Sequence, residues 1–354
     1  MPAKKTIALL FGGRSAEHEV SIQSASAVYG HLDKTRYTII CLYIARDGRW
    51  KRVASPLVPP GELRRGVFHS FLPWQAPGSA ALRADLYFPV LHGPYGEDGT
   101  IQGLLEMADV PFVGPGVLAS AAGMDKDVMK ALFQAGGLLV SPWIVIRDFE
   151  WRANRAAILR RIKGLFAPPY FVKPANLGSS VGISKVKAHG RAGAAIDLAL
   201  SYDRKILVEK GIDGREIECA VLGNDKPRAS RPGEVIPYND FYDYRDKYKD
   251  GKTRFGIPAD LPPEVTAEVR RQAVAAFRAC QAEGLARVDF FLESKSGDLI
   301  VNEINTLPGF TEISMYPKLW GITGLPYGKL LDRLIALGFE RHRRKKRRTA
   351  GAMA

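Results

Sequence analysis

Short apolar runs alternate with segments of helical pattern in the first third of the chain, and this alternation most narrows the possible folds. The runs 6–11, 37–44 and 84–91 predict buried strands, and the segments 19–32 and 100–107 predict helices. Strands that alternate with helices favour a parallel sheet, which indicates an α/β fold. Ligands of such sheets usually lie where the strands end. We therefore expect a binding site near the glycines that follow the first and third strands (Gly12, Gly13 and Gly93).

The chain of 354 residues is long enough for two or three domains, and it carries a formal charge of +14. Seven basic residues stand between positions 341 and 348, and they leave +7 for the rest of the chain. Such a run could contact nucleic acid or acidic lipid. We favour a solvated, disordered tail at 341–354, and we expect no nucleic-acid and no membrane partner. The remaining excess suits anionic ligands such as nucleotides.

Cysteine use and hydropathy favour the cytoplasm. Cys41, Cys219 and Cys280 stand far apart among apolar neighbours, and no CxxC occurs. This pattern predicts buried free thiols in a reducing compartment rather than a zinc ribbon or a redox dithiol. The apolar run near the N-terminus is too short for a signal sequence, and no stretch approaches the ~20 apolar residues that span a membrane.

Two β-rich runs, 286–293 and 299–305, flank a polar turn that contains Gly297, and they predict a hairpin. If the turn is centred on Ser296, each residue of the first run faces the residue of the second run that is equally far from Ser296 in the sequence. This register predicts two facing pairs, Asp289 with Glu303 and Arg287 with Asn305.

Side chains two apart on a strand share a face, so Asp289, Glu303 and Asn305 converge beside Arg287. Two carboxylates directly opposite each other repel unless a cation lies between them. An all-oxygen set suits Mg²⁺ that bridges nucleotide phosphates, and the set contains no ligand that favours zinc. A salt-bridge cluster around Arg287 is the alternative.

The loop 173–182, Lys-Pro-Ala-Asn-Leu-Gly-Ser-Ser-Val-Gly, follows an apolar strand at 170–173. Its glycines and serines suit a phosphate, although it does not match the Walker pattern. Lys173 could pair with a phosphate as a point charge, but a lysine in this position is more often exposed. A helix at 126–134 and a strand at 205–210 complete this middle segment.

Several other features are ambiguous by themselves. Glu17 can complement a helix dipole, and His92 can be an ordinary loop residue. The pair Pro308-Gly309 forces a turn, and its bare backbone N–H could also hold an oxyanion beside Arg287. The tract 237–256, rich in Tyr, Asp and Lys, predicts a long ordered loop of the kind that forms a lid.

Taken together, these segments resemble the D-alanine–D-alanine ligase family of the ATP-grasp superfamily. They follow the family's order between about residues 5 and 338. The matching segments are Phe11-Gly-Gly-Arg-Ser-Ala-Glu-His-Glu-Val-Ser21, Leu91-His-Gly-Pro-Tyr-Gly-Glu-Asp-Gly-Thr100, Met124-Asp-Lys126, Lys173 to Gly182, Phe241-Tyr-Asp-Tyr-Arg-Asp-Lys-Tyr248, Arg287-Val-Asp289 and Asn302-Glu-Ile-Asn-Thr-Leu-Pro-Gly-Phe-Thr311.

The resemblance implies an N-terminal parallel-sheet domain at 1–118 that binds the first D-alanine. Two ATP-grasp domains, 119–212 with the glycine-rich lid and 213–340 with the metal site, would sandwich the nucleotide. ATP would phosphorylate the carboxylate of the first D-alanine, and the amine of the second D-alanine would attack the acyl phosphate. The dipeptide would enter peptidoglycan synthesis.

The resemblance also implies roles for residues that face the nucleotide. Phosphate contacts fall to Lys126, Lys173, Ser180 and Lys247. The adenosine contacts would come from Glu209, Lys210, Ile212, Glu216 and Phe241. Magnesium, which manganese could replace, would be held as two ions by Asp289, Glu303 and Asn305.

For the amino acids, the resemblance assigns Glu17 and His92 to the first D-alanine, and Ser314 with Met315 to the second. Arg287 and the backbone of Gly309 would form the oxyanion site. Ser179 and Tyr248 would network with Glu17 and close the lid. Relatives that make D-alanyl-D-lactate lack tyrosine at position 248, so we expect the dipeptide rather than the ester.

Arg245-Asp246 stand where relatives often have Glu-Ala, which leaves the docking of the lid open. A homodimer follows from the resemblance alone. Two other functions stay open at this stage. One is an ATP-grasp ligase with D-lactate or a different amino acid in the second site, and the other is a nucleic-acid-binding protein that uses the tail.

Overall fold

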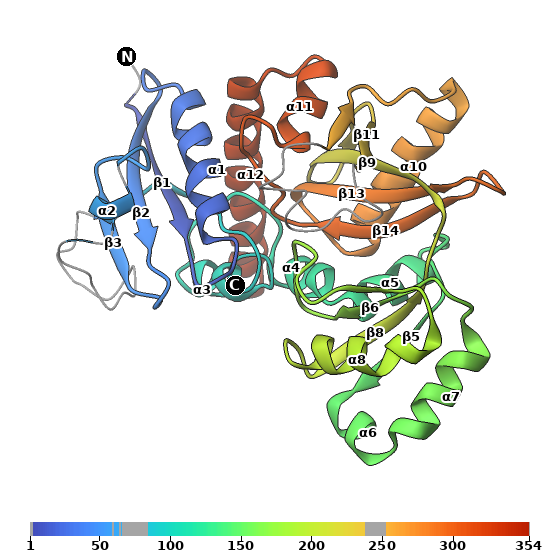
Figure 1. Cartoon of the computed structure of the whole chain (residues 1–354). Coiled ribbons are helices and arrows are strands. Elements are labelled where there is room, and N and C mark those ends of the chain that lie inside the picture. The colour runs from blue at the N-terminus through green and yellow to red at the C-terminus, as the bar shows by residue number, and fades with distance from the viewer. Residues whose placement is uncertain (1–2, 59, 64, 66–83, 238–252, 354) are drawn as a thin grey trace.

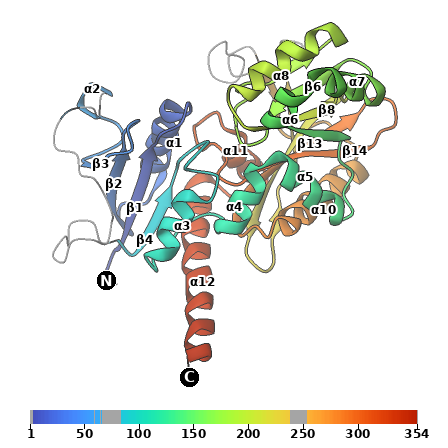
Figure 2. The ribbon, with the colours of Figure 1, turned by 90° about the horizontal axis from the view of Figure 1, so that it is seen from below.

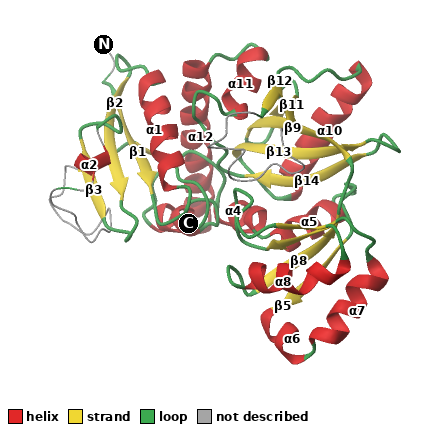
Figure 3. Ribbon diagram, in the orientation of Figure 1, coloured by secondary structure: helices red, strands yellow, loops and turns green. Residues whose placement is uncertain are grey.

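The structure is a computed structural model that describes the chain except residues 1–2, 59, 64, 66–83, 238–252 and 354. The described residues form three β-sheets with helices packed around them (Figure 1). The long helix α12 (Tyr327–Met353) lies between the first sheet and the second, as the view by secondary structure also shows (Figure 3).

The first sheet has the strand order β3-β2-β1-β4. Its central strand β1 (Lys5–Gly12) runs parallel to β2 (Tyr37–Ile44) and to β4 (Leu86–Pro89), so the predicted parallel α/β arrangement is confirmed. An edge strand that the sequence pattern did not predict, β3 (Trp50–Val53), pairs antiparallel with β2. The associated helices are α1 (His18–His31), α2 (Pro60–Leu63) and α3 (Thr100–Met107).

The second sheet is antiparallel and has the order β12-β11-β9-β13-β14, with β10 beside β9. The helices α10 (Pro263–Ala279) and α11 (Met315–Ile322) pack against it. Its strands are β9 (Gly214–Gly223), β10 (Arg228–Ala229), β11 (Gly233–Ile236), β12 (Arg254–Gly256), β13 (Gly284–Glu293) and β14 (Leu299–Asn305). The tract 237–256 was expected to be one loop, but it ends in β12, and its residues 238–252 lie outside the described part.

The hairpin of β13 and β14 has the predicted register at its functional end. Asp289 pairs with Glu303, and Arg287 pairs with Asn305. A bulge between Asp289 and Phe290 shifts the remaining pairs by one residue. Because of this shift, Phe290 lies opposite Val301, and both side chains are buried in the core behind the sheet.

The third sheet is smaller, has the order β5-β8-β6-β7 and possesses its own apolar core. Its strands are β5 (Trp143–Arg147), β6 (Tyr170–Pro174), β7 (Ser184–Val186) and β8 (Lys205–Lys210). The 3₁₀ turn His189–Arg191 precedes α8 (Ala192–Leu200), which covers the sheet together with α6 (Asp148–Ala153) and α7 (Arg155–Leu165).

Two helices connect the small sheet to the second one. The segment Gly114 to Gly116 turns into α4 (Val117–Met124), and Asp125 caps the following α5 (Lys126–Ala135) by accepting from the N–H groups of Asp127 and Val128. Ala119 of α4 and Phe133 of α5 belong to the same core as β9 and β13. These helices therefore connect the small sheet to the hairpin of β13 and β14, which carries Asp289 and Glu303.

The prediction of a disordered tail at 341–354 is wrong, because α12 continues as a helix to Met353. Figure 2 shows its C-terminal end extending beyond the rest of the molecule. The side chain of Arg341 stacks on Phe112 at 3.9 Å from the ring centroid and donates to the carbonyl of Gly114. Arg344 pairs with Asp225 and Glu283. Acidic side chains and backbone carbonyls from the rest of the protein thus bind Arg341 and Arg344, which the sequence pattern predicted to be solvated.

Candidate active site

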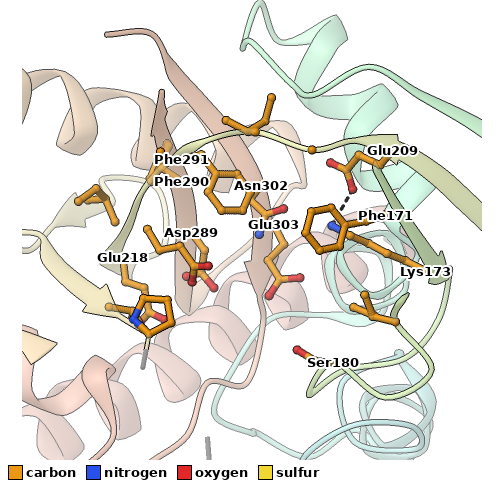
Figure 4. Close-up of a pocket in the computed structure, with 18 of the residues that line it drawn as sticks. Phe171, Lys173, Ser180, Glu209, Glu218, Asp289, Phe290, Phe291, Asn302 and Glu303 are labelled. Carbon is orange, nitrogen blue, oxygen red and sulfur yellow. Dashed lines mark ion pairs between the residues drawn. The ribbon is translucent and has the colours of Figure 1, made fainter. Parts of the chain in front are cut away.

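A cavity of about 650 Å³ lies between the small sheet and the acidic hairpin. In Figure 4, Lys173 and Glu209 come from the small sheet, and Asp289 and Glu303 come from the opposite wall. Ser180 lies at the edge, on the loop that follows β6. The volume of this cavity suits a nucleotide. Lysine side chains on one wall can contact its phosphates, and carboxylates on the other wall can bind a metal ion.

The hairpin wall combines carboxylates with one half-buried guanidinium. Arg287 donates from Nε and Nη2 to the two oxygens of Asp289, each at 2.7 Å, and its Nε lies 3.1 Å from Glu218. Asn305 donates to Asp289 at 2.9 Å. Burial would lower the pKa of Arg287, but Asp289 and Glu218 outweigh burial and hold the pKa well above its usual value. The salt-bridge cluster considered above is thus formed.

The same wall fits a divalent cation. Across the described residues, no group of three or more His, Cys, Asp or Glu side chains is arranged to hold a metal ion. The hairpin instead offers two facing carboxylates, Asp289 and Glu303, and the amide of Asn305. Oxygen ligands of this kind suit Mg²⁺, which commonly completes its shell with phosphate oxygens and water.

Opposite the hairpin, two lysines share one buried carboxylate. Glu209 Oε1 lies 2.7 Å from Lys130 Nζ, and its Oε2 lies 2.7 Å from Lys173 Nζ. Burial would raise the pKa of Glu209, but the two ammonium groups lower it to about 2. Burial lowers the pKa of Lys126, one helical turn before Lys130. Lys173 is therefore paired within the protein rather than exposed to solvent.

The loop 173–182 adopts a conformation that its composition permits. Ser179 and Ser180 have positive φ values of 51° and 59°, and Gly182 has 73°. A Cβ at Gly182 would lie 2.8 Å from both Pro174 and Tyr202, so a larger residue would displace the loop. Lys126 Nζ donates to the carbonyl of Leu177 at 2.5 Å, which holds the loop against α5.

A smaller cavity of about 120 Å³ adjoins the first one, on the side of the parallel sheet. Glu17 precedes α1 without capping it, and its carboxylate accepts from the hydroxyl of Ser179 instead. His92 follows β4 and contacts Ser24 at 3.0 Å and the carbonyl of Leu307 at 3.1 Å. Burial lowers the pKa of His92. A neutral imidazole and a carboxylate therefore face this cavity.

The far wall of the smaller cavity is the turn after β14. The hydroxyl of Ser314 accepts from the N–H of Thr311 at 3.0 Å. A Cβ at Gly309 would approach that hydroxyl to 2.7 Å, so a larger residue here would displace the side chain of Ser314. The N–H of residue 309 and the guanidinium of Arg287 can both face a substrate here, because both residues line the cavity.

Every predicted site residue that the structure describes lines one of the two cavities. The larger cavity contains Lys126, Lys173, Ser180, Glu209, Lys210, Ile212, Glu216, Asp289 and Glu303. The smaller contains Glu17, His92, Ser179, Arg287, Asn305, Gly309, Ser314 and Met315. The predicted residues Phe241, Lys247 and Tyr248 lie outside the described residues.

Sequence reasoning missed two charged residues that line these cavities, Glu218 and Glu97, and a third, Lys130, that pairs with Glu209 behind the larger cavity. Lys130 could have been found from its place one helical turn after Lys126. Glu218 lines both cavities and lies two residues from Glu216 on β9. Glu97 lines the smaller cavity and accepts from the N–H of Gly93 at 2.6 Å. Burial, reinforced by Glu17, raises the pKa of Glu97 to about 8.

The fold combines a parallel-sheet unit with two antiparallel units, and a cavity lined partly by lysines lies between the two antiparallel units. This arrangement defines an enzyme of the ATP-grasp class. Family models described as "D-ala D-ala ligase N-terminus" and "D-ala D-ala ligase C-terminus" match residues 6–115 and 132–336. The chain belongs to the D-alanine–D-alanine ligase family. It joins two D-alanines, at the expense of ATP, to the dipeptide used in peptidoglycan synthesis.

Relatives match over nearly the whole chain. The D-alanine–D-alanine ligase of Heliobacterium modesticaldum is 48% identical, with 97% of each chain covered. That of Solibacter usitatus is also 48% identical, with 97% of this chain and 98% of the relative covered. The structure of the ligase from Coxiella burnetii has a TM-score of 0.86 and 38% identity, with 98% of this chain and 97% of the other covered.

A second solved structure differs in its named substrate. The VanG D-Ala:D-Ser ligase of Enterococcus faecalis has a TM-score of 0.83 and 36% identity, with 95% of this chain and all of that chain covered.

Within the described residues, no helix is both long and apolar enough to cross a membrane.

Proposed function

We propose that the ligation runs through a D-alanyl phosphate formed where the two cavities meet. An oxygen of the first D-alanine's carboxylate attacks the γ-phosphorus of ATP, and ADP leaves. The amine of the second D-alanine, having lost a proton, attacks the acyl carbon, and phosphate leaves. One observation carries this proposal: Arg287 and Glu303 line both the larger and the smaller cavity. A phosphoryl group could pass between the cavities at this shared wall.

For the nucleotide, Asp289, Glu303 and Asn305 would hold two Mg²⁺ ions, or Mn²⁺ in their place. The metal would neutralise charge on the β- and γ-phosphates. On the opposite wall, Lys126, Lys173 and Ser180 would contact the phosphates. Adenosine would lie toward the residues of β8 and β9 that line the same cavity, Glu209, Lys210, Ile212 and Glu216. Phe241 and Lys247 remain assigned by resemblance.

For the amino acids, the carboxylate of Glu17 would bind the first substrate's ammonium, with His92 beside it. Arg287 and the N–H of Gly309 would stabilise the oxyanion that forms when the second amine attacks. Ser314, with Met315, would bind the carboxylate of the second D-alanine. The hydroxyl that Ser179 donates to Glu17 would fix that carboxylate and carry the loop over the site.

The identity of the second substrate is tested by competition. We expect phosphate release from ATP and Mg²⁺ with D-alanine alone, and a dipeptide detected by mass spectrometry. D-serine, D-lactate and L-alanine, each added at equal concentration, should yield little mixed product. Tyr248→Phe should raise the use of D-lactate, since the family's ester-forming relatives lack tyrosine here. Release that appears only with added D-lactate or D-serine would move the enzyme to another branch of the family.

The nucleic-acid alternative is disfavoured by the fold of the tail. Arg344, Lys345 and Lys346 pair with acidic residues of the same chain, so these charges are partly neutralised. A variant that ends at Glu340 would abolish salt-sensitive nucleic-acid binding if the alternative held. We also propose that the enzyme is cytoplasmic and forms a homodimer. Light scattering after size exclusion would test the homodimer by its molar mass.

A further inference from the structure

The buried pair of Lys130 and Glu209 lies directly behind the proposed phosphate site. Lys130 is on α5, one helical turn after Lys126, and its side chain is 2% exposed. Glu209 is 3% exposed, and Lys173, its second partner, is 12% exposed. Charged groups this deeply buried are stable only when they remain paired.

The two lysines differ in what else they can reach. Lys173 lines the larger cavity, so its ammonium can turn toward an incoming phosphate. Lys130 is enclosed, with its Nζ 5.7 Å from the ring centroid of Trp143. Trp143 is the partner of Glu209 across β5 and β8, so ring and carboxylate form one pocket around the Lys130 ammonium. Lys130 therefore stays with Glu209 whatever binds in the cavity.

We propose that Lys130 is a positioning residue that keeps Glu209 paired when Lys173 turns from Glu209 to the phosphates of ATP. The inference rests on the proposed function, because it assumes that phosphates bind beside Lys173. With Lys130 present, the departure of Lys173 leaves a one-to-one ion pair. Without Lys130, the same movement would leave a buried carboxylate with no cation, and ATP would have to compete with Glu209 for Lys173.

The test compares ATP binding by calorimetry in the full-length protein, without D-alanine. Lys130→Met should raise the Kd for ATP at least tenfold. Because Glu209 is itself assigned to adenosine, the reference for the second comparison is Glu209→Gln, in which the competing carboxylate is gone. Adding Lys130→Met to Glu209→Gln should change the Kd by less than threefold, whereas a purely structural role of Lys130 would raise the Kd in both backgrounds. Lys163→Met, at an exposed lysine of α7, is the matched control and should leave the Kd unchanged.

A Kd within twofold of wild type in Lys130→Met would overturn the inference, and so would an equal rise of the Kd when Lys130→Met is added to Glu209→Gln. If Lys130→Met fails to fold, as judged by circular dichroism, Lys130→Gln is measured in its place, alone and in the Glu209→Gln background, with the same limits. Since binding is measured without D-alanine, the inference can fail while ligation succeeds. Loss of ligation in the wild type would instead contradict the proposed function.

Discussion

Glu303 lines both cavities, as Glu218 does, and it lies opposite Asp289 on the hairpin. Glu303→Gln keeps the size of the side chain and removes its charge. If Glu303 holds the metal, turnover should fall at least about a hundredfold, and the Mg²⁺ concentration for half-maximal rate should rise. Steady-state phosphate release across a Mg²⁺ titration measures both effects.

The control for this substitution lies on the same hairpin. Asp298→Asn changes an exposed carboxylate in the turn between β13 and β14, and it should leave rate and Mg²⁺ dependence unchanged. Near-normal activity of Glu303→Gln would remove the metal assignment from this residue.

Glu97 predicts a pH dependence of stability. Its pKa is raised from 4.5 to about 8, so between these values the folded protein keeps a proton that the unfolded chain has lost. The stability from this proton is present at low pH and is lost as the pH rises toward 8. The slope is at most about 1.4 kcal/mol per pH unit. Glu97→Gln should flatten the urea-unfolding free energy between pH 5.5 and 7.5.

The exposed residue Glu264 gives the comparison for this experiment, because Glu264→Gln should keep the wild-type slope. An equally steep slope in Glu97→Gln would show that the proton resides on another group.

The sequence alone could predict residue pairs that a local register determines, such as Asp289 with Glu303. It could not predict that Lys130 pairs with Glu209, because that contact joins a helix to a strand about 80 positions away. The raised pKa of Glu97 has the same origin, since it depends on Glu17 and on burial between segments distant in sequence. Residues 241, 247 and 248 stay predictions from the resemblance.

At the scale of elements, the strands and helices with strong patterns were predicted, whereas the edge strand β3, the bulge of the hairpin and the helical tail were not. The bulge of the hairpin, where Asn302 of β14 has no opposite residue, depends on how Phe290 and Val301 pack against the core behind the sheet. The helical tail depends on acidic partners, Glu106 and Asp109 near α3 and Asp225 and Glu283 near the second sheet. A run of basic residues indicates disorder only when no such partners lie within reach.

The attachment of α12 can be measured at Arg341. This guanidinium donates to the carbonyls of Phe112 and Gly114 and stacks on the Phe112 ring. Arg341→Met keeps most of the apolar stem but leaves both carbonyls without this donor. We expect the free energy of unfolding in urea to fall by about 2 kcal/mol.

Arg343 is exposed on the same helix, and Arg343→Met should change stability by less than about 0.5 kcal/mol. Equal effects of the two substitutions would mean that the net charge of the helix, rather than the Arg341 contacts, determines stability.

At the scale of the whole molecule, the site depends on contacts between units. The hydroxyl of Ser179, on the loop of the small sheet, donates to Glu17 beside the parallel sheet. Ser179→Ala should raise the KM for D-alanine about tenfold and leave the Kd for ATP within threefold. Ser201→Ala, at an exposed serine after α8, is the control and should alter neither constant. A loss of ATP binding instead would assign Ser179 to the nucleotide.

The central claim is that a phosphoryl group passes from ATP to the carboxylate of the first D-alanine at the wall shared by the two cavities. The most direct measurement uses D-alanine labelled with ¹⁸O in both carboxylate oxygens, unlabelled ATP and Mg²⁺, with mass spectrometry of the released phosphate. The account predicts one ¹⁸O atom in each phosphate, because the bridging oxygen of the acyl phosphate leaves with phosphorus. Unlabelled phosphate formed together with D-alanyl-D-alanine would contradict it.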